Sequence, residues 1–214
     1  MKTGGTDSDL APPHAASLAE SMRAFGYDLA TALADLADNS LFARARHIHL
    51  KFHWDGEHSA IALADDGAGM SEDTLVESMR LGSRNPSEQR DASDLGRFGL
   101  GLKTASFSQC RRVTVFTRMK GSAAPAVRCW DLDHIAKTDR WELLREASPR
   151  AKKLAACLAE QKSGTVVVWE NLDRLAAGTH TESDAEQDVF LRNADQVGEH
   201  FAMVFHRLME GAGR

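Results

Sequence analysis

Residues 65–70 read Asp-Asp-Gly-Ala-Gly-Met and follow the largely apolar run Ser-Ala-Ile-Ala-Leu-Ala at residues 59–64. We therefore expect a buried strand that ends at two carboxylates. The glycines, Gly67 and Gly69, let the backbone turn sharply and let a ligand approach it closely. A carboxylate at such a strand end can accept a hydrogen bond from an exocyclic amine, and Met70 offers a soft contact for a flat ring. The same residues are also compatible with a plain Asp-Gly turn.

A helix is expected upstream, over about residues 27–46, because leucines recur there at helical spacing. Asp35 and Asn39 lie four residues apart on one face of that helix, beside the leucine face. Both side chains would then point into a pocket at the edge of the sheet. Alternatively, together with Asp38, they are solvated polar residues of an amphipathic helix.

Downstream, residues 96–104 read Gly-Arg-Phe-Gly-Leu-Gly-Leu-Lys-Thr. Glycines before a helix expose consecutive backbone N–H groups, which form an anion site, and Lys103 and Thr104 add a positive charge and a hydroxyl. This is not a Walker A loop, because Leu102 separates Gly101 from the lysine. Its G-x-x-G-x-G spacing in mid-chain also differs from the Rossmann fingerprint. A glycine-rich hinge before a helix is the alternative interpretation.

The segment around this cluster is basic and long for a mere connection. Residues 80–120 contain nine Lys or Arg against three Asp or Glu, although the 214-residue chain has a net charge of −5. Residues 82–98 are polar and punctuated by glycine, which is typical of a functional loop, and we expect a mobile lid there. The positive charge is either a solvated face or the neighbour of a polyphosphate. Its overlap with the lid and the glycines favours the polyphosphate.

The rest of the chain alternates between short strands and helices. Strands are expected at residues 47–54, 59–66, 111–118, 125–132, 140–146 and 163–172. Helices are expected at 71–81 after a Ser71 cap, at 99–108, from Ser148-Pro149, and from a Ser183-x-x-Glu186 capping box onward. The last helix would have an apolar face of Phe190, Val197, Phe201, Val204 and Leu208. We expect a disordered leader at residues 1–14 and one layered α/β domain after it.

Composition excludes several protein classes. With 43% hydrophobic and 27% charged residues and only five prolines, the chain has the balance of a globular protein, not of a disordered or fibrous one. Its cysteines, Cys110, Cys129 and Cys157, stand far apart without metal-finger spacing, which fits a reducing compartment. No apolar run reaches the length of a signal peptide or a membrane span, so a cytoplasmic protein with no membrane partner is expected. The acidic balance argues against binding nucleic acid through bulk charge.

Three histidines, His47, His49 and His53, fall on one face of the strand expected at 47–54. This spacing is compatible with a metal site. A plain polar sheet face is favoured, because no carboxylate or cysteine at ligand spacing accompanies them.

Taken together, the clusters at 35–39, 65–70 and 96–104 resemble, in order and spacing, those of the GHKL ATPases. This superfamily contains gyrase B subunits, ninety-kilodalton heat-shock chaperones, histidine kinases, MutL and the MORC proteins, and the motif style is closest to MORC-like bacterial proteins. The resemblance implies the Bergerat fold. This fold is α+β, a two-layer α/β sandwich with a mixed, mostly antiparallel sheet and helices on one face. It would cover residues 15–212 as one ATP-binding domain at the N-terminus of a longer protein.

The resemblance also implies the cofactors ATP and Mg²⁺ and a role for each motif. Asp35 would be the general base, Asn39 the magnesium ligand, and Asp65 the acceptor for the adenine amino group. Thr165, after Gly164, would assist adenine binding through water. The other nucleotide contacts implied are Gly67, Gly69, Met70, Gly96, Phe98, Gly99, Leu100, Gly101, Leu102, Lys103 and Thr104.

Two departures from the family pattern bear on activity. The usual base is glutamate, and Asp35 is one methylene shorter, which changes its reach toward an attacking water. In some relatives, a lysine from a transducer domain that follows the ATP-binding domain contacts the γ-phosphate. We do not expect that domain within these 214 residues.

The expected function is magnesium-dependent ATP binding with slow hydrolysis. Closing of the lid and ATP-dependent formation of a homodimer through a downstream domain would then drive that domain, or a DNA or protein client. Two alternatives stay open: an ATP-sensing module without hydrolysis, and a protein kinase of the histidine-kinase or anti-sigma type.

Overall fold

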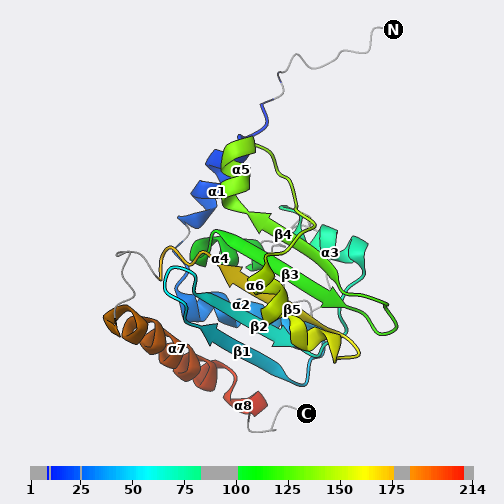
Figure 1. Ribbon diagram of the computed structural model, residues 1–214, viewed down its shortest axis with the longest axis vertical. Coiled ribbons are helices and arrows are strands. Elements are labelled where there is room, and N and C mark those ends of the chain that lie inside the picture. Colours follow the sequence, from blue (N-terminus) through cyan, green and yellow to red (C-terminus); the bar gives the residue numbers. More distant parts are fainter. Residues whose placement is uncertain (1–8, 10, 25, 83–100, 176–183, 210–214) are drawn as a thin grey trace, which may run out of the picture.

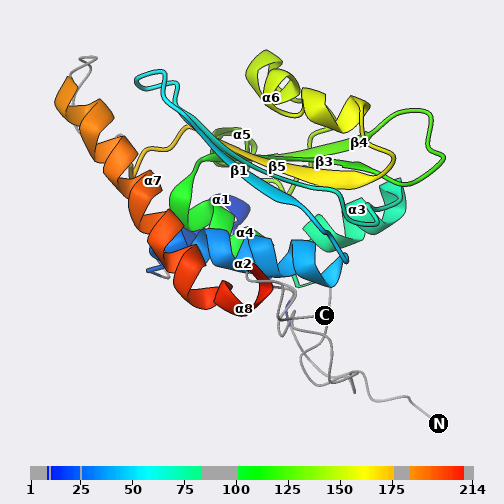
Figure 2. The same cartoon turned by 90° about the horizontal axis from the view of Figure 1, so that it is seen from below.

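The computed structural model of the chain describes residues 9, 11–24, 26–82, 101–175 and 184–209. Antiparallel strands form one five-stranded sheet, and most helices lie on one of its faces (Figures 1 and 2). The strands are β1 (Ile48–His53), β2 (Ala60–Asp65), β3 (Arg112–Arg118), β4 (Ala126–Asp131) and β5 (Gly164–Glu170). The helices are α1 (Ala15–Arg23), α2 (Leu29–Phe42), α3 (Glu72–Met79), α4 (Gly101–Gln109), α5 (Leu132–Thr138), α6 (Pro149–Leu154), the 3-10 helix η1 (Ala156–Ala159), α7 (Asp184–Val204) and α8 (His206–Met209). The α+β fold class expected from the sequence is confirmed.

The strand order is β1-β2-β5-β3-β4, so β5, the last strand along the sequence, lies in the centre of the sheet. Its Val-Val-Val-Trp run is buried, as a continuous apolar run in a central strand should be. The register places Asp65 of β2 opposite Thr165 of β5, and Thr165 opposite Thr117 of β3. Three polar residues from three strands therefore meet at one end of the sheet.

Both faces of the sheet carry an apolar core, because side chains alternate between the faces along each strand. The larger core joins the sheet to α1, α2, α4 and α7 and includes Leu33, Leu36, Ile61, Leu63, Val115, Val167, Trp169 and Phe190. The smaller core lies between the sheet and α6 with η1, and includes Ala62, Ala64, Phe116, Ala151, Leu158, Val166 and Val168. Figure 2 shows the resulting layers, with the main helical layer on one side of the sheet and α6 on the other.

Polar side chains cap the starts of several helices. The side chains of Asp28, Ser71 and Ser148 accept hydrogen bonds from backbone N–H groups in the first turns of α2, α3 and α6. Pro149 occupies the first turn of α6, where a backbone N–H would have no partner within the helix. The helix starts predicted at Ser71 and Ser148 are confirmed. The first predicted helix is also present as α2, but it is shorter than expected and ends at Phe42.

The strand predicted over residues 140–146 is wrong. Leu144 forms an isolated bridge with Cys129 of β4, and the segment around it has no regular strand structure. A helix that the sequence patterns did not predict, α5, precedes it. The carboxylate of Asp131 accepts two backbone N–H groups at the start of α5, which turns the chain into a helix directly at the end of β4.

The sequence patterns also did not predict α1, which begins where the ordered domain was expected to start. It buries Ala15, Ala19 and Met22, which recur at helical spacing. These side chains pack α1 against α4 and α5. Small residues give a weak hydrophobic pattern, so the helix is apparent only from these tertiary contacts.

The long helix near the C-terminus is confirmed as α7. Phe190 and Val197 of the predicted apolar face are buried, whereas Val204 of the same face is 48% exposed. Phe201, in the last turn of the helix and on the same face, is partly buried and packs against the core. The predicted cap Ser183 and the side chain of Leu208 lie outside the described residues. None of the helices in the described part of the chain is long and apolar enough to cross a membrane.

Two further predicted segments lie largely outside the described residues. One is the lid at 82–98, of which Gly82 is described. The other is the leader at 1–14, of which residues 9 and 11–14 are described and form no regular secondary structure. The expected mobility of both segments stays a prediction.

Candidate functional site

Asp65 is the centre of the candidate site. It is the last residue of β2, and only 4% of it is exposed. One carboxylate oxygen accepts hydrogen bonds from the backbone N–H groups of Gly67 (2.9 Å) and Thr165 (3.2 Å), and the other accepts from the hydroxyl of Ser40 (2.9 Å). Burial raises the pKa of Asp65, and these hydrogen bonds act in the opposite direction. The carboxylate is therefore fixed by α2, β5 and the loop that follows β2.

Two threonines continue the polar row beyond Asp65. The hydroxyls of Thr117 and Thr165 lie 3.1 Å apart on neighbouring strands. The Thr117 hydroxyl also accepts a hydrogen bond from the backbone N–H of Met70 (2.9 Å), which ties the loop after β2 to the end of β3. The structure thus brings together the predicted residues Asp65, Met70 and Thr165.

Two glycines of the site are needed for close backbone contacts. A Cβ atom at Gly69, where φ is +69°, would lie 1.9 Å from the carbonyl oxygen of Arg118. A Cβ atom at Gly164, where φ is +150°, would lie 2.1 Å from the carbonyl oxygen of Asp65. Any side chain at either position would push apart the backbone segments that form the site.

We predict that Gly69→Ala lowers the free energy of unfolding by at least about 2 kcal/mol, since the clash with Arg118 adds to the cost of the left-handed backbone. Urea denaturation measures this change. The matched control is Gly121→Ala, because Gly121 also has a positive φ, +87°, and no atom of the described residues lies within 4 Å of its Cβ position. Equal losses in the two variants would contradict the argument from the close contact.

α2 carries the predicted base and magnesium ligand. Asp35 is partly buried and Asn39 is exposed, and the side-chain nitrogen of Asn39 donates to the backbone oxygen of Asp35 (2.9 Å). Burial, and then the charge of Asp35, raise the pKa of Asp38. Ser40, the next residue after Asn39, donates a hydrogen bond to Asp65. α2 therefore carries Asp35 and Asn39 and also contacts the carboxylate at the end of β2.

The start of α4 lies beside Asp35. A Cβ atom at Gly101 would be 3.9 Å from a carboxylate oxygen of Asp35. The Lys103 ammonium donates to the backbone oxygen of Ser78 (2.8 Å) at the end of α3, and only 2% of the residue is exposed. Leu102 and Thr104 are partly buried. Four other predicted phosphate contacts, Gly96, Phe98, Gly99 and Leu100, lie outside the described residues.

Tyr27, directly before α2, links that helix to α4. Its backbone oxygen accepts a hydrogen bond from the side chain of Gln109 (2.7 Å) at the end of α4. Burial raises the pKa of its hydroxyl, as do the charge of Asp35 and a hydrogen bond to it, while a hydrogen bond with Thr104 acts against the rise. The phenol is therefore protonated at neutral pH, with Asp35 and Thr104 beside it.

Sequence reasoning missed Tyr27, Ser40 and Thr117. Ser40 directly follows the motif residue Asn39, and this adjacency was the one sequence signal that pointed to it. Thr117 enters the site because β5 separates β2 from β3, and Tyr27 enters because α2 packs against α4. Both depend on tertiary arrangement, which residue spacing does not encode.

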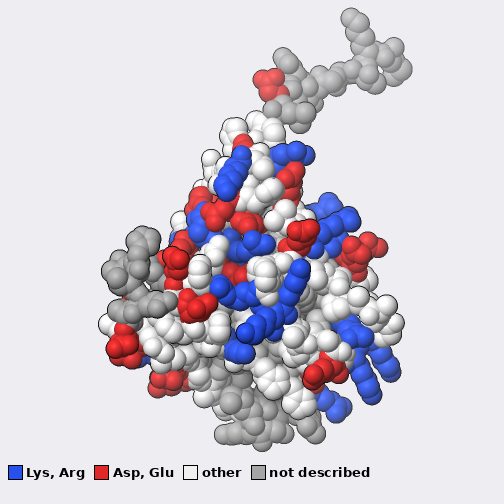
Figure 3. Space-filling view, in the orientation of Figure 1, with Lys and Arg blue, Asp and Glu red and all other residues white. Residues whose placement is uncertain are grey.

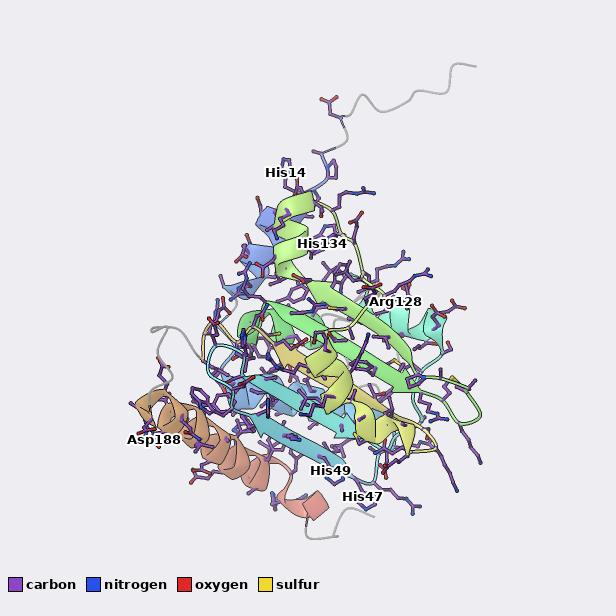
Figure 4. The ribbon with its side chains drawn as sticks, in the orientation of Figure 1. His14, His47, His49, Arg128, His134 and Asp188 are labelled. Carbon is purple, nitrogen blue, oxygen red and sulfur yellow. The ribbon has the colours of Figure 1, made fainter. Side chains whose placement is uncertain are left out.

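Asp66, the neighbour of Asp65, has a different environment. It accepts hydrogen bonds from the backbone N–H groups of Arg46 (2.7 Å) and His47 (2.9 Å) and from the His47 ring (2.8 Å). Burial raises its pKa, but the hydrogen bonds from His47 and Arg46 outweigh that effect and lower the pKa to about 2. Figure 4 shows His47 and His49 close to one end of β1. No group of three potential metal-ligating side chains occurs among the described residues.

We predict that Asp66→Asn lowers the free energy of unfolding by about 1 kcal/mol at pH 7, and by less as the pH falls from about 5 toward 2. The folded pKa lies below the ordinary value near 4, so the carboxylate stabilises the fold above pH 4 and this contribution is lost as the pH falls toward 2. Urea denaturation across this pH range measures the difference. Glu199→Gln, an exposed change on α7, is the control, and a pH-independent difference for Asp66→Asn would contradict the assignment.

Comparisons with known proteins identify the family. A family model described as "Histidine kinase-, DNA gyrase B-, and HSP90-like ATPase" matches residues 27–165, which contain the segments of Asp35, Asp65 and Thr165. The chaperone protein HtpG of Psychromonas ingrahamii is 31% identical over 105 residues, which are 44% of this chain and 16% of HtpG. The ATPase morc-1 of Caenorhabditis elegans is 26% identical over 180 residues, which are 69% of this chain and 21% of morc-1. The chain therefore spans about a fifth or less of the length of these relatives. Since the family model covers more than half of the sequence, the chain belongs to the GHKL-type ATPases, the family of histidine kinase-, DNA gyrase B- and HSP90-like ATPases.

Proposed function

We propose that this chain binds ATP with Mg²⁺ and hydrolyses it slowly. The observation that carries the proposal is the fixed carboxylate of Asp65, which Ser40 of α2 and Thr165 of β5 hold at the buried end of the sheet. A buried carboxylate in this position can accept a hydrogen bond from the amino group of adenine. Met70, which is partly buried beside Thr117, would contact the flat face of the ring.

The phosphates and the metal would lie toward α2 and α4. Backbone N–H groups at the start of α4, from Gly101 onward, form the kind of site that binds an anion. Lys103 would reach a phosphate only by exchanging its hydrogen bond with Ser78. Asn39 uses its amide nitrogen within α2, so its amide oxygen, a ligand type that Mg²⁺ accepts, is the atom proposed to hold the metal. The metal would neutralise charge on the phosphates.

Asp35 is proposed to orient the attacking water and accept its proton. Its carboxylate lies near Gly101, where the phosphates are expected, and beside the hydroxyl of Tyr27. Phosphoryl transfer depends mainly on positioning and charge neutralisation, which these residues can provide. We further propose that the lid at 82–98 closes over the nucleotide. We also propose that a homodimer formed through a downstream domain passes this change to that domain, or to a DNA or protein client.

The test is calorimetry with a non-hydrolysable ATP analogue and Mg²⁺, followed by turnover with radiolabelled ATP. We expect saturable one-site binding and slow release of free phosphate. Label that appears on protein would instead identify a kinase. Binding without phosphate release, even in single turnover at high protein concentration where weak dimers form, would identify an ATP-sensing module.

A further inference from the structure

A groove lies on the face of the sheet opposite to the candidate nucleotide site, between η1 and the loop that joins β3 to β4. One part, of about 600 Å³, is lined by Arg118, Lys120, Ser122, Glu160 and Lys162, among others. The second part, of about 250 Å³, is lined by Phe116, Val127, Lys152 and Ala156, among others. Ala159 lines both parts, so they adjoin, and we call the two together the basic groove.

Positive charge lies at both ends of the basic groove. Lys120 and Lys162 are exposed at one end and Lys152 is exposed at the other, and no ion pair with the described residues is seen for any of the three. Among the described residues that line the groove, Glu160 is the one acidic residue. Figure 3, which views this face, shows Lys and Arg side chains gathered over α6 and at the end of the β3–β4 loop. A ligand with negative charges at two separate points fits this arrangement.

Arg118 lines the end of the basic groove that also contains Lys120 and Lys162. Its guanidinium donates to the backbone oxygens of Ala159 (3.0 Å) and Ser122 (3.3 Å), which holds η1 against the β3–β4 loop. Its Nε atom is buried and finds no hydrogen-bond partner among the described residues. The charge of this side chain is thus fixed at the groove.

The part between the charged ends is apolar. Phe116 and Ala155 are each 6% exposed, and Val127 and Ala156 continue the surface. Aliphatic side chains gain about 25 cal/mol for each Å² of apolar surface removed from water. A nucleic-acid backbone offers no aliphatic group to this floor.

We propose that the basic groove binds an acidic peptide segment of a partner protein, with an aliphatic side chain on the apolar floor and carboxylates at Lys120, Lys162 and Lys152. The proposal does not depend on ATP hydrolysis. Thr117 faces the candidate nucleotide site, and the side chain of the next residue, Arg118, lines the groove on the opposite face. Changes to the groove lysines should therefore leave nucleotide binding intact.

The test uses fluorescence anisotropy with a labelled peptide in which acidic and aliphatic residues alternate. A second peptide keeps the acidic residues and replaces the aliphatic ones with serine, and labelled single-stranded and duplex DNA serve as further probes. We expect the first peptide to bind with a Kd in the micromolar range and the serine peptide to bind at least about 10-fold more weakly. Tighter binding of DNA, or no binding of the first peptide, would overturn the proposal.

Two variants locate the binding surface. The double change Lys120→Glu/Lys162→Glu is expected to weaken peptide binding at least about 10-fold. Ala156→Trp, which fills the apolar part without a change of charge, is expected to weaken it similarly.

The matched control is Lys137→Glu/Lys153→Glu. It makes the same charge change at exposed positions of α5 and α6 that do not line the groove. We expect the control to bind the peptide within about 2-fold of the parent, because charge away from the surface contributes little. Equal losses in the two double variants would show binding by bulk charge and would overturn the proposal. Retained binding of the ATP analogue would show that each variant is folded.

Discussion

Replacing Asp35 with Ala is expected to lower the rate of ATP hydrolysis by at least about 100-fold, which is the usual contribution of a general base. The affinity for a non-hydrolysable ATP analogue should change much less, because Asp35 takes no part in the hydrogen bonds that fix Asp65. Single-turnover release of phosphate at saturating ATP measures the rate, and calorimetry measures the affinity.

Two further variants make the result specific to the carboxylate at this position. Asp38→Ala removes a partly buried carboxylate three residues along α2 and should cost much less activity. Asp35→Glu keeps the carboxylate and should retain most of the turnover. Hydrolysis by Asp35→Ala at the parental rate would show that another group accepts the proton.

Replacing Asp65 with Asn is expected to weaken binding of the ATP analogue by about 10- to 100-fold, the range for losing a hydrogen bond to a charged group. The fold should survive. The remaining side-chain oxygen can still accept from Gly67 and Thr165, while the new NH₂ group can face Ser40, whose hydroxyl can rotate to accept it. The acceptor for the adenine amino group is then weakened without a cavity. Calorimetry with Mg²⁺ and the analogue measures this change.

Asp66→Asn is the matched control for this experiment. It makes the same chemical change in the adjacent residue, whose carboxylate contacts Arg46 and His47 and not the candidate site. Its affinity for the analogue should stay within about 2-fold of the parent. If Asp65→Asn binds the analogue as tightly as the parent, the assignment of the adenine pocket is wrong.

Sequence patterns predicted the elements whose signals are local. The start of α3 could be predicted from Ser71 and that of α6 from Ser148, because each cap acts within one helical turn. The end of β2 could be predicted because its apolar run stops at Asp65. The start of β5 could be predicted because a second apolar run follows Gly164 and Thr165. These short-range features also put Asp65 at the end of β2 and Thr165 at the start of β5.

What the patterns could not predict depends on contacts between distant segments. α1 and α5 are short helices that pack on each other, and one of the contacts between these segments is the pair of His14 and Asp139 (2.7 Å). The direction of the Lys103 side chain was also beyond the sequence. Six of the nine residues of α4 are buried and the other three are partly buried, so the spacing of its residues does not distinguish a face toward α3 from a face toward a ligand. Its hydrogen bond to Ser78 could be found only from the fold.

The central position of β5 has a consequence for how the chain folds as it is synthesised. β1 with β2 and β3 with β4 can each pair as soon as they are made, but each pair is only a two-stranded ribbon, which is marginally stable alone. Neither ribbon has its permanent neighbour until residues 164–170 leave the ribosome and insert between them. The partner of Asp65 on β5 arrives in the same step. The sheet and the candidate nucleotide pocket are therefore completed together, late in folding. A chain that binds nucleotide would then already have a complete sheet.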